Sequence, residues 1–459
     1  MSTRRATIDA RHTARSRHSA LAPFLSGWGQ VPRVPGLETR SEDLTGLSAH
    51  GARLARGLGR AYGDAALPAP HDFHVIGTSL ADRVIQFDEN EGVLLAEAGL
   101  SLDRLASLSL RRGFFVPVSP GTRFVTLGGM VACDVHGKNH HVAGSIGNHI
   151  RRLTVRVPDG RIVKCSPLEE ADLFWATIGG MGLTGAVLDV ELSMTRIPSR
   201  WIWEEREAVS NIDLMIDGLR NAARQWPMTV AWIDCLASGS SLGRGVIIKG
   251  RWASAEEAPS HEPPRRPMLS LPFDMPRFVL SSPAVRAFNA MHYWAHRVHT
   301  GARVVHPYTF FYPLDGLHNW RRLYGEQGFV QYQCVLPYPD VTTPARAILA
   351  LLNRGLTSFL CIVKDCGEEG LGLLSFPKPG ISIALDIPYR GSETQTIVDE
   401  MNRAVIAAGG RIYLAKDALT RAEHFAAMES RLPAFLAARE KWDPNRRLRS
   451  AQSVRLLGW

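Results

Sequence analysis

Short segments in which apolar and polar residues alternate recur along the chain, and this alternation predicts β-strands. In the first half they are FHVIG, VLLAEAG, a hairpin LTVRV-PDG-RIVKC over 153–165, and AVLDVELSM over 186–194. A helical pattern, EEADLFWATI over 169–178, precedes the last of these strands. We therefore expect a mixed α+β region between about residues 50 and 198. Residues 1–50 are rich in Arg, Ser, Thr and Pro, and we expect them to be irregular.

Alternation returns in the second half, in FVQYQCVLP over 329–337, SFLCIVKDC over 358–366 and ISIALDIPY over 381–389. The segments ARAILALLNRG and IVDEMNRAVIAAGG have helical spacing, and Gly409 and Gly410 end the second helix. A further strand, RIYLAKD, is predicted directly after it.

In FVQYQCVLP the alternation places Gln331 and Gln333 on one face and Val330, Tyr332 and Cys334 on the other. Two carboxamides on one strand face indicate either solvent or a cavity. The flanking sequence is strongly apolar, which favours a cavity in which Gln333 forms a hydrogen bond to a ligand.

The strand ISIALDIPY alternates in the same way. Its isoleucines and leucine form a core face, and Ser382, Ala384 and Asp386 lie on the opposite face.

Residues 252–306 follow neither pattern. Prolines lie there among Met, Phe, Leu and Trp, a composition too apolar for a polar linker. The prolines are Pro259, Pro263, Pro264, Pro267, Pro272, Pro276 and Pro283. We expect a loop-like excursion, which either packs against the body of the protein or forms a mobile flap that meets a lipid-like ligand.

The composition is that of a globular protein, because 45% of the 459 residues are hydrophobic and 21% are charged. Residues 1–60 hold ten Arg and four Asp or Glu, which accounts for +6 of the net charge of +9. The basicity therefore belongs mostly to the N-terminal region, which suits contact with an anionic membrane surface better than a long nucleic-acid groove.

The six cysteines are scattered and show no C-x-x-C pair, so we expect reduced thiols. The N-terminus lacks the apolar region of a signal peptide, and no apolar stretch approaches the roughly 20 residues that span a bilayer. We expect a cytoplasmic protein, with peripheral contact to the inner membrane left open.

Three glycine-rich segments stand out. GMGLTG at 180–185 fits the pattern G-x-G-x-x-G, but a predicted helix precedes it and a strand follows, the reverse of a dinucleotide-binding unit. In ARGLGRAYGD (55–64) and PGTRFVTLGGMVACDVHGKNHH (120–141), glycines let backbone N–H groups converge on an anion. Two such turns suggest a diphosphate cradle, although each taken alone also fits a simple tight turn.

Together the motifs R-G-x-G-R-A-Y-G-D, P-G-T-R-x-V-T-x-G-G, D-V-H-G-K-N-H-H and F-W-A-T-x-G-G-x-G-L-T-G resemble the flavin domain of the vanillyl-alcohol oxidase superfamily. More narrowly, the chain resembles the flavoprotein subunits of decaprenylphosphoryl-β-D-ribose 2′-epimerases. The likeness runs from Gly27 to the C-terminal KWDP and includes FVQYQCVLP and YLAKD. It implies a two-domain α+β flavoprotein, with an FAD domain over 1–198, an inserted antiparallel-sheet substrate domain over 199–413, and residues 414–459 completing the FAD domain.

The resemblance also implies the residues that bind FAD. They are Arg56, Gly57, Leu58, Gly59, Arg60, Tyr62, Gly121, Thr122, Thr126, Gly128, Gly129, Cys133, His136, Gly137, Gly182, Ala186 and Tyr413. Many relatives carry a histidine at the position of Arg60 and attach the flavin to it covalently. Arginine does not form that bond, so we expect non-covalent FAD.

The implied reaction is oxidation of the 2′-hydroxyl of a polyprenylphosphoryl ribofuranose to a ketone, with the flavin as electron acceptor. It needs a proton acceptor, hydrogen bonds to the sugar, and positive charge near the flavin. The resemblance assigns these tasks to Lys416, His136 and Gln333. Lys416, at the end of the predicted strand RIYLAK, supplies the charge and, if burial lowers its pKa, the base.

The substrate-binding residues implied are Lys138, Trp232, Gln331, Gln333, Lys364, Ser382 and Ala384. Ala384 replaces a cysteine that nitroaromatic inhibitors modify in mycobacterial members of the family, so we expect that covalent inhibition to fail here. A separate NAD(P)H-dependent keto-reductase is the implied partner, because only one cofactor site is evident.

Other functions stay open at this point. His136, His140, His141 and His149 lie close in sequence, but without a regular helix or a nearby carboxylate or thiol pair we expect no metal site. An oxidase of a soluble sugar alcohol or aldonolactone is the alternative within the oxidoreductases. A basic nucleic-acid-binding protein would leave the glycine turns without a role.

Overall fold

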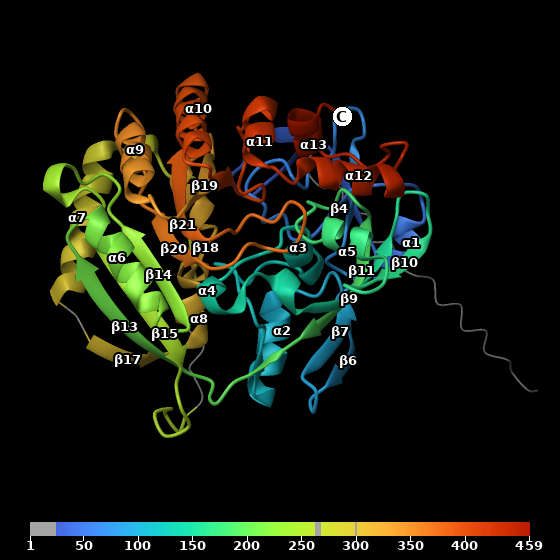
Figure 1. Cartoon of the computed structure of the whole chain (residues 1–459), viewed down its shortest axis with the longest axis horizontal. Coiled ribbons are helices and arrows are strands. Elements are labelled where there is room, and N and C mark those ends of the chain that lie inside the picture. The colour runs from blue at the N-terminus through green and yellow to red at the C-terminus, as the bar shows by residue number, and fades with distance from the viewer. Residues whose placement is uncertain (1–23, 262–267, 299–300) are drawn as a thin grey trace, which may run out of the picture.

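The strands of the second half of the chain form one antiparallel sheet, in the order β17-β13-β15-β14-β20-β21-β19-β22. The protein is described by a computed structural model that covers residues 24–261, 268–298 and 301–459, and the sheet occupies its left half in Figure 1. The strands are β13 (Ile202–Val209), β14 (Met228–Ile233), β15 (Gly245–Trp252), β17 (Gly301–Val305), β19 (Phe329–Pro337), β20 (Cys361–Cys366), β21 (Gly380–Pro388) and β22 (Arg411–Ile412).

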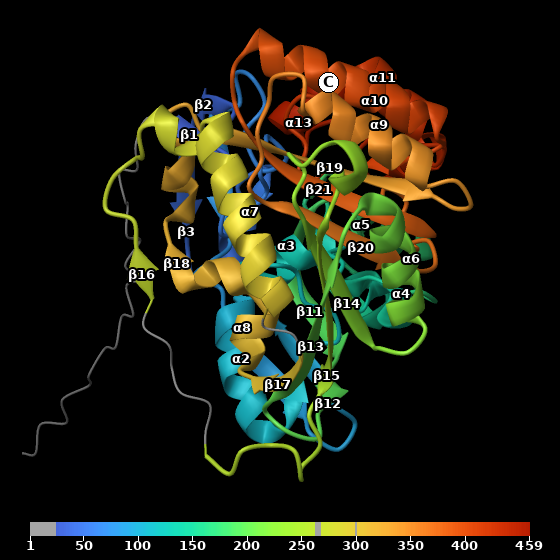
Figure 2. The same cartoon turned by 90° about the vertical axis from the view of Figure 1, so that its left-hand side faces the viewer.

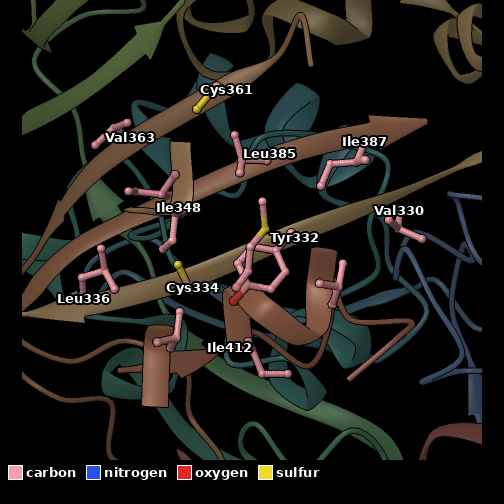
Figure 3. Close-up of a cluster of buried hydrophobic side chains, with 14 of the residues drawn as sticks. Val330, Tyr332, Cys334, Leu336, Ile348, Cys361, Val363, Leu385, Ile387 and Ile412 are labelled. Atoms are coloured by element: carbon pink, nitrogen blue, oxygen red, sulfur yellow. The ribbon is translucent and has the colours of Figure 1, made fainter. Parts of the chain in front are cut away.

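Three helices cover one face of this sheet: α6 (Ile212–Ala223), α9 (Thr342–Leu352) and α10 (Ser392–Ala407). Figure 3 shows Val330, Tyr332 and Cys334 of β19 pointing into the core that they share with β20, β21 and α9. Burial of each large side chain there contributes roughly 1.5–3 kcal/mol. The apolar positions of the alternation are thereby fixed on the helix side, so the polar positions face the other way.

A second antiparallel sheet, in the order β10-β9-β11-β7-β6, forms the core of the N-terminal half. Its strands are β6 (Val84–Asp88), β7 (Val93–Glu97), β9 (Ile150–Arg156), β10 (Ile162–Cys165) and β11 (Ala186–Ser193). The helices α2 (Leu102–Ser109), α3 (Leu127–Ala132) and α5 (Ala171–Thr177) pack with it into one core. Thr126 begins α3 by accepting a hydrogen bond from the backbone N–H of Gly129.

Smaller elements connect these layers. They are β1 (Phe24–Ser26), β2 (Arg33–Pro35), β3 (Leu37–Arg40), α1 (Leu44–Ser48), β4 (Ala55–Arg56), β5 (His74–Gly77), β8 (Phe114–Phe115), α4 (His140–Ala143), β12 (Thr195–Arg196), β16 (Leu269–Ser270), α8 (Pro307–Phe311) and β18 (Leu317–His318). The strands β3, β5 and β4 form a parallel sheet, in which β4 leads directly into the first glycine turn.

The C-terminal helices return to the N-terminal half. They are α11 (Ala422–Met428), α12 (Leu432–Trp442) and α13 (Ala451–Leu457), drawn in red at the upper right of Figure 1. α12 packs on α5, and Arg455 of α13 forms ion pairs with Asp64 (2.7 Å) and Asp417 (2.9 Å). The end of the chain thus holds the first glycine turn against the turn that carries Lys416.

Most of the predicted elements are confirmed, including the hairpin β9–β10, α5, β11, β19, β21, α9 and α10. The prediction that residues 1–50 are irregular was wrong from residue 24 on, because β1, β2, β3 and α1 are too short to show a period. Residues 1–23 lie outside the described residues. The predicted strand over 358–366 begins only at Cys361.

The strand prediction for RIYLAK was also wrong in its second half. β22 ends at Ile412, and Lys416 donates its backbone N–H to the carbonyl of Tyr413 (2.9 Å), which closes a turn. β22 pairs with β19 only at Arg411 and Ile412. The chain beyond that edge is therefore free to turn and carry Lys416 towards the middle of the molecule.

The loop-like prediction for 252–306 was wrong for α7 (Ser282–Val298), a 17-residue helix. Pro283 occupies its first turn, where the missing N–H costs nothing, and neither proline nor glycine follows until Gly301. Residues 262–267 and 299–300 lie outside the described residues. Within the described ranges no helix is long and apolar enough to cross a membrane, and the six cysteines are free. The predicted domain boundaries at 198/199 and 413/414 stay predictions.

The ion pairs of Arg455 predict a stability difference. Arg455→Met leaves Asp64 and Asp417 buried without their cation, so the free energy of unfolding should fall by about 3–5 kcal/mol. Arg449→Met removes a partly exposed pair with Asp72 and should cost about 0–1 kcal/mol. Urea unfolding followed by circular dichroism measures both; equal losses would contradict this account of α13.

Candidate functional site

A cavity of about 330 Å³ lies where the polar face of the large sheet meets the glycine turns of the N-terminal half. Strands β13, β14, β15, β19, β20 and β21 supply one wall, and the segments around residues 57–62, 119–138 and 181–182 supply the other. The cavity therefore joins parts of the chain that are more than 300 residues apart in sequence.

The glycine turns present backbone to the cavity. A Cβ atom at Gly57 would lie 2.3 Å from the hydroxyl oxygen of Thr126, so the two turns touch and position 57 has no room for a side chain. Gly59 (φ +63°) and Gly182 (φ +77°) have backbone conformations that favour glycine. At Gly121 no atom lies within 4 Å of the Cβ position. This wall leaves room for a ligand that approaches the main chain closely.

Arg60 lies on the same wall. Its guanidinium group stacks on the indole of Trp28, 3.9 Å from the ring centroid, and burial lowers its pKa. The carboxylate of Asp315 faces it and accepts hydrogen bonds from the Thr122 hydroxyl and the Arg123 backbone, each at 2.8 Å. Arg60 is thus fixed by an aromatic ring and balanced by one acid.

A hydrogen-bonded group occupies the middle of the cavity. The amide nitrogen of Gln333 lies 2.9 Å from Nε2 of His136 and 3.1 Å from the hydroxyl of Ser382. Burial, followed by the charges of Lys364, His140 and Lys416, lowers the pKa of His136 well below its usual value, so its imidazole is neutral at pH 7. Nδ1 of His136 is buried and has no hydrogen-bond partner among the described residues, which leaves it for a bound group.

Lys416 lies against this group. Its ammonium nitrogen sits 3.9 Å from the centroid of the Tyr62 ring, and burial lowers its pKa to about 8 although Asp386 opposes the shift. Asp386 is fully buried behind the cavity wall and accepts hydrogen bonds from Gln331 and from the hydroxyl of Tyr324. Its own pKa is raised by burial to about 7.

Two further lysines lie at another part of the cavity wall. Lys138 donates to the backbone carbonyls of Phe310 (2.8 Å) and Phe311 (3.0 Å), and burial lowers its pKa to about 7. Burial also lowers the pKa of Lys364 on β20. Within the described chain, neither lysine has a carboxylate within ion-pair distance. Trp232 also lines the cavity, with its indole N–H donating to the carbonyl of Phe359 (3.1 Å).

Most of the residues singled out in the sequence line this one cavity. They are Gly57, Leu58, Gly59, Arg60, Tyr62, Gly121, Thr122, Thr126, Gly129, Cys133, His136, Lys138, Gly182, Trp232, Gln331, Gln333, Lys364, Ser382, Ala384, Tyr413 and Lys416. Their individual roles stay predictions, but the structure brings them together.

Four predicted cofactor residues lie outside the lining. Arg56 turns away and donates to the carbonyls of Ser26 and Ala66. Gly128 packs on Ala98 and Gly137 on the backbone of Ser119. Ala186 lines a separate pocket of about 140 Å³.

Several cavity residues escaped the sequence analysis. Trp28, Glu204, Arg206 and Asp315 line the cavity, and Asp386 lies directly behind it. Asp386 shares its strand face with Ser382 and Ala384, so the alternation of β21 was a signal for it. Glu204 and Arg206 carry the same period-two signal on β13, whereas Asp315 sits in a turn with no pattern.

The rings of His136 and His140 stay in contact, with 6.1 Å between their centroids, and the other histidines form separate hydrogen bonds. Nδ1 of His140 accepts from the Gly367 backbone (3.0 Å), and His141 and His149 each contact a backbone carbonyl at 2.8 Å. In the described part of the chain, no three side chains of the metal-binding types come together.

Comparison with known proteins supports a flavin site. A family model described as "FAD binding domain" matches residues 48–166. The chain is 34% identical over 444 residues to the decaprenylphosphoryl-β-D-ribose oxidase of Mycolicibacterium smegmatis, a match that covers 92% of this chain and 94% of the relative. A putative D-arabinono-1,4-lactone oxidase of Neurospora crassa is 28% identical over 110 residues, which is 24% of this chain and 19% of the relative. L-gulonolactone oxidase of Mus musculus is 28% identical over 123 residues, 26% of this chain and 27% of the relative.

The cavity fits FAD. The glycine turns, which lie within the matched FAD-binding segment, offer main-chain N–H groups without side chains, as a diphosphate requires. The unpartnered Nδ1 of His136 and the ammonium of Lys416 offer polar contacts at the inner end, beside the ring of Tyr413. Burial raises the pKa of Cys133 to about 12, so its thiol is not a nucleophile at pH 7.

Proposed function

The chain belongs to the family of decaprenylphosphoryl-β-D-ribose oxidases, which are FAD-dependent oxidoreductases, and we propose that it oxidises the 2′-hydroxyl of a polyprenylphosphoryl ribofuranose to a ketone. The proposal is supported above all by one observation. The neutral imidazole of His136, the amide of Gln333 and the ammonium of Lys416 converge at the inner end of the cavity.

The roles of these groups follow from their chemistry. Bound FAD supplies the two-electron oxidant that the alcohol requires. Gln333 is held by Ser382 and His136, so its amide is fixed in direction and suited to orient a sugar hydroxyl. Lys416, whose pKa lies near 8, is neutral in roughly a tenth of molecules at pH 7 and then accepts the hydroxyl proton.

The other end of the cavity suits the rest of this substrate. Lys138 and Lys364 have no carboxylate partner in the described chain. The phosphodiester of the proposed substrate, which is attached to the carbon next to the reacting one, supplies an anion for them. Beyond them Trp232, Leu360 and Ile362 form an apolar wall for the beginning of the prenyl chain.

Two partners follow from the same proposal. The ketone is only half of an epimerisation, so a separate NAD(P)H-dependent reductase would complete it. The prenyl chain is insoluble in water, which favours peripheral contact between the protein and a membrane. We also propose that FAD is bound non-covalently, because the position that carries the linking histidine in many relatives is Arg60, which stacks on Trp28.

Anaerobic flavin bleaching tests the reaction. We expect the yellow protein to lose its flavin absorbance with polyprenylphosphoryl ribose but not with free ribose, arabitol or an aldonolactone. Acid precipitation should release all FAD into the supernatant. Bleaching by the soluble compounds alone would instead favour the sugar-alcohol or aldonolactone oxidase, and two lactone oxidases each match about a quarter of this chain.

The pKa of Lys416 predicts a pH profile. The rate of anaerobic flavin reduction should rise with pH and level off above about pH 8, because only the neutral amine accepts a proton. Lys416→Arg keeps the positive charge but removes the base. The rate of flavin reduction should therefore fall at least about a hundredfold, and the rate should no longer depend on pH near 8. Stopped-flow absorbance across neutral and alkaline pH measures both, with the exposed Lys164→Arg as control. Full activity of Lys416→Arg, or a rate that falls above pH 8, would assign Lys416 to charge alone.

Lys364 predicts a preference for phosphate. Lys364→Met should lower kcat/KM for the phosphorylated substrate by about ten- to a hundredfold, the value of one charge-assisted hydrogen bond. It should leave turnover of a neutral prenyl ribofuranoside nearly unchanged, since that compound makes no such bond. Steady-state assays of both compounds with wild type, Lys364→Met and Lys164→Met decide this. An equal loss with both compounds would show that Lys364 does not contact the phosphate.

A further inference from the structure

The helix α7 carries apolar residues on both its buried and its exposed side, and Val285 and Tyr293 face the core. Its exposed face carries Phe288, Met291 (65% exposed), Trp294 (51%) and Val298 (75%), which fall within one arc at helical spacing. A surface helix of a globular protein normally turns such a stripe into the core. Here the fold turns it outward.

Val285 and Tyr293 pack against the protein, and hydrogen bonds from polar side chains of α7 hold this orientation. Asn289 is fully buried and donates to the carboxylate of Asp234 (2.9 Å). His296 lies against Arg206, and the guanidinium of Arg286 donates to the carbonyl of Leu236. Rotation of the helix to bury the apolar stripe would break these hydrogen bonds. The exposure is therefore a built feature of the fold.

The stripe continues into the segment before α7. The short helix η4 (Arg277–Leu280) packs on α7 and exposes Phe278 (72%), and Phe273, five residues earlier, is also exposed. In Figure 2 α7 runs along the side of the molecule that faces the viewer. Single exposed apolar residues are common, but this many large side chains on adjoining elements mark an interaction surface. We call Phe278, Phe288, Met291, Trp294 and Val298 the α7 patch.

The charges around the α7 patch are mostly positive. Residues 268–298 contain Arg277, Arg286 and Arg297 but only one acid, Asp274. Arg297 lies over the ring of Trp294, 4.9 Å from its centroid. An apolar stripe with tryptophan and an arginine border is typical of helices that lie in the interface of a membrane with anionic lipids. A second copy of the chain, docked through the same face, would bring two basic surfaces together, which opposes association.

The α7 patch also connects to the cavity. The ring of Phe288 packs on His292 (5.9 Å between centroids), and His292 packs on Trp232 (4.5 Å), which lines the cavity. Phe288 also contacts Phe359 on the other side. Aromatic side chains thus lead from the exposed helix face to the cavity wall.

We propose that the α7 patch inserts into one leaflet of a membrane that contains anionic lipids, with α7 parallel to the surface and its arginines at the headgroups. The proposal rests on the surface alone and does not require the proposed reaction. If both hold, a lipid-linked substrate reaches the cavity along Phe288 and Trp232 without leaving the leaflet.

Vesicle binding by the full-length holoprotein tests this. Wild type should co-sediment with phosphatidylcholine vesicles that contain phosphatidylglycerol, and more weakly with phosphatidylcholine alone. The double variant Met291→Asp, Trp294→Asp should lower the partition coefficient at least about tenfold. The matched control is Leu168→Asp, Leu371→Asp, which places two charges on exposed leucines outside the α7 patch (Leu168 is 98% exposed) and should bind as wild type does.

A fluorescent label at position 291 gives an independent readout. The native cysteines are buried or half-buried, so an environment-sensitive dye on Met291→Cys reports on α7. We expect its emission to shift to the blue on anionic vesicles, whereas the same dye on Leu168→Cys should not shift. If the aspartate variants fold poorly, as judged by their FAD content, the dye measurement alone shows whether the α7 patch enters the membrane.

Three results would overturn the proposal. The first is that wild type fails to bind the vesicles, or that the aspartate variants bind as tightly as wild type and the dye at position 291 shows no blue shift. The second is that deletion of residues 1–20 abolishes vesicle binding whereas substitution of the α7 patch does not, which would assign membrane binding to the N-terminal region. The third is that light scattering finds wild type as a dimer and the aspartate variants as monomers, with no vesicle binding. A second copy of the chain would then cover the α7 patch. Failure of flavin reduction by the lipid substrate, with vesicle binding intact, would remove only the proposed reaction.

Discussion

The structure depends on one electrostatic constraint, the enclosure of three lysine ammonium groups around a single cavity. Lys138, Lys364 and Lys416 all line it, and none has a carboxylate within ion-pair distance in the described part of the chain. Burial lowers the pKa of each. An unpaired cation in such a place is costly, and evolution retains it where a ligand supplies the opposite charge. The site is therefore suited to ligands that carry negative charge.

The constraint explains why the two halves of the chain meet as they do. The three lysines come from three separate segments: the turn after α3, the strand β20, and the turn after β22. The ammonium group of Lys138 donates to two backbone carbonyls, which fix its position without neutralising its charge. Asp386 stands behind the wall, where its carboxylate moderates Lys416 without neutralising it. A closer acid would make Lys416 a permanent cation and remove it as a proton acceptor.

The sequence predicted the parts of this site that follow a period or a motif. The alternation of FVQYQCVLP places Gln331 and Gln333 on the cavity face of β19, and the structure confirms both. The glycine turns were recognisable because a close approach to backbone leaves no alternative residue. The prediction was wrong where tertiary contacts override local pattern: Lys416 follows a turn rather than ending a strand, because β22 is an edge strand with only two paired residues.

The same limit explains why α7 was missed. Its prolines lie before or within the first turn, where they do not oppose a helix, but they made the whole segment look irregular. The exposure of its second apolar stripe could not be predicted from periodicity, which gives the stripe but not the side on which the core lies. The side is set by Asp234, a buried acid at the end of β14 that holds Asn289 of α7 and is itself paired with Arg244. Trp232 of the cavity lies on β14, two residues before Asp234, which directly follows the strand. One strand thus fixes both the inner wall of the site and the helix at the surface, so the apolar patch and the cavity keep a constant relation to each other.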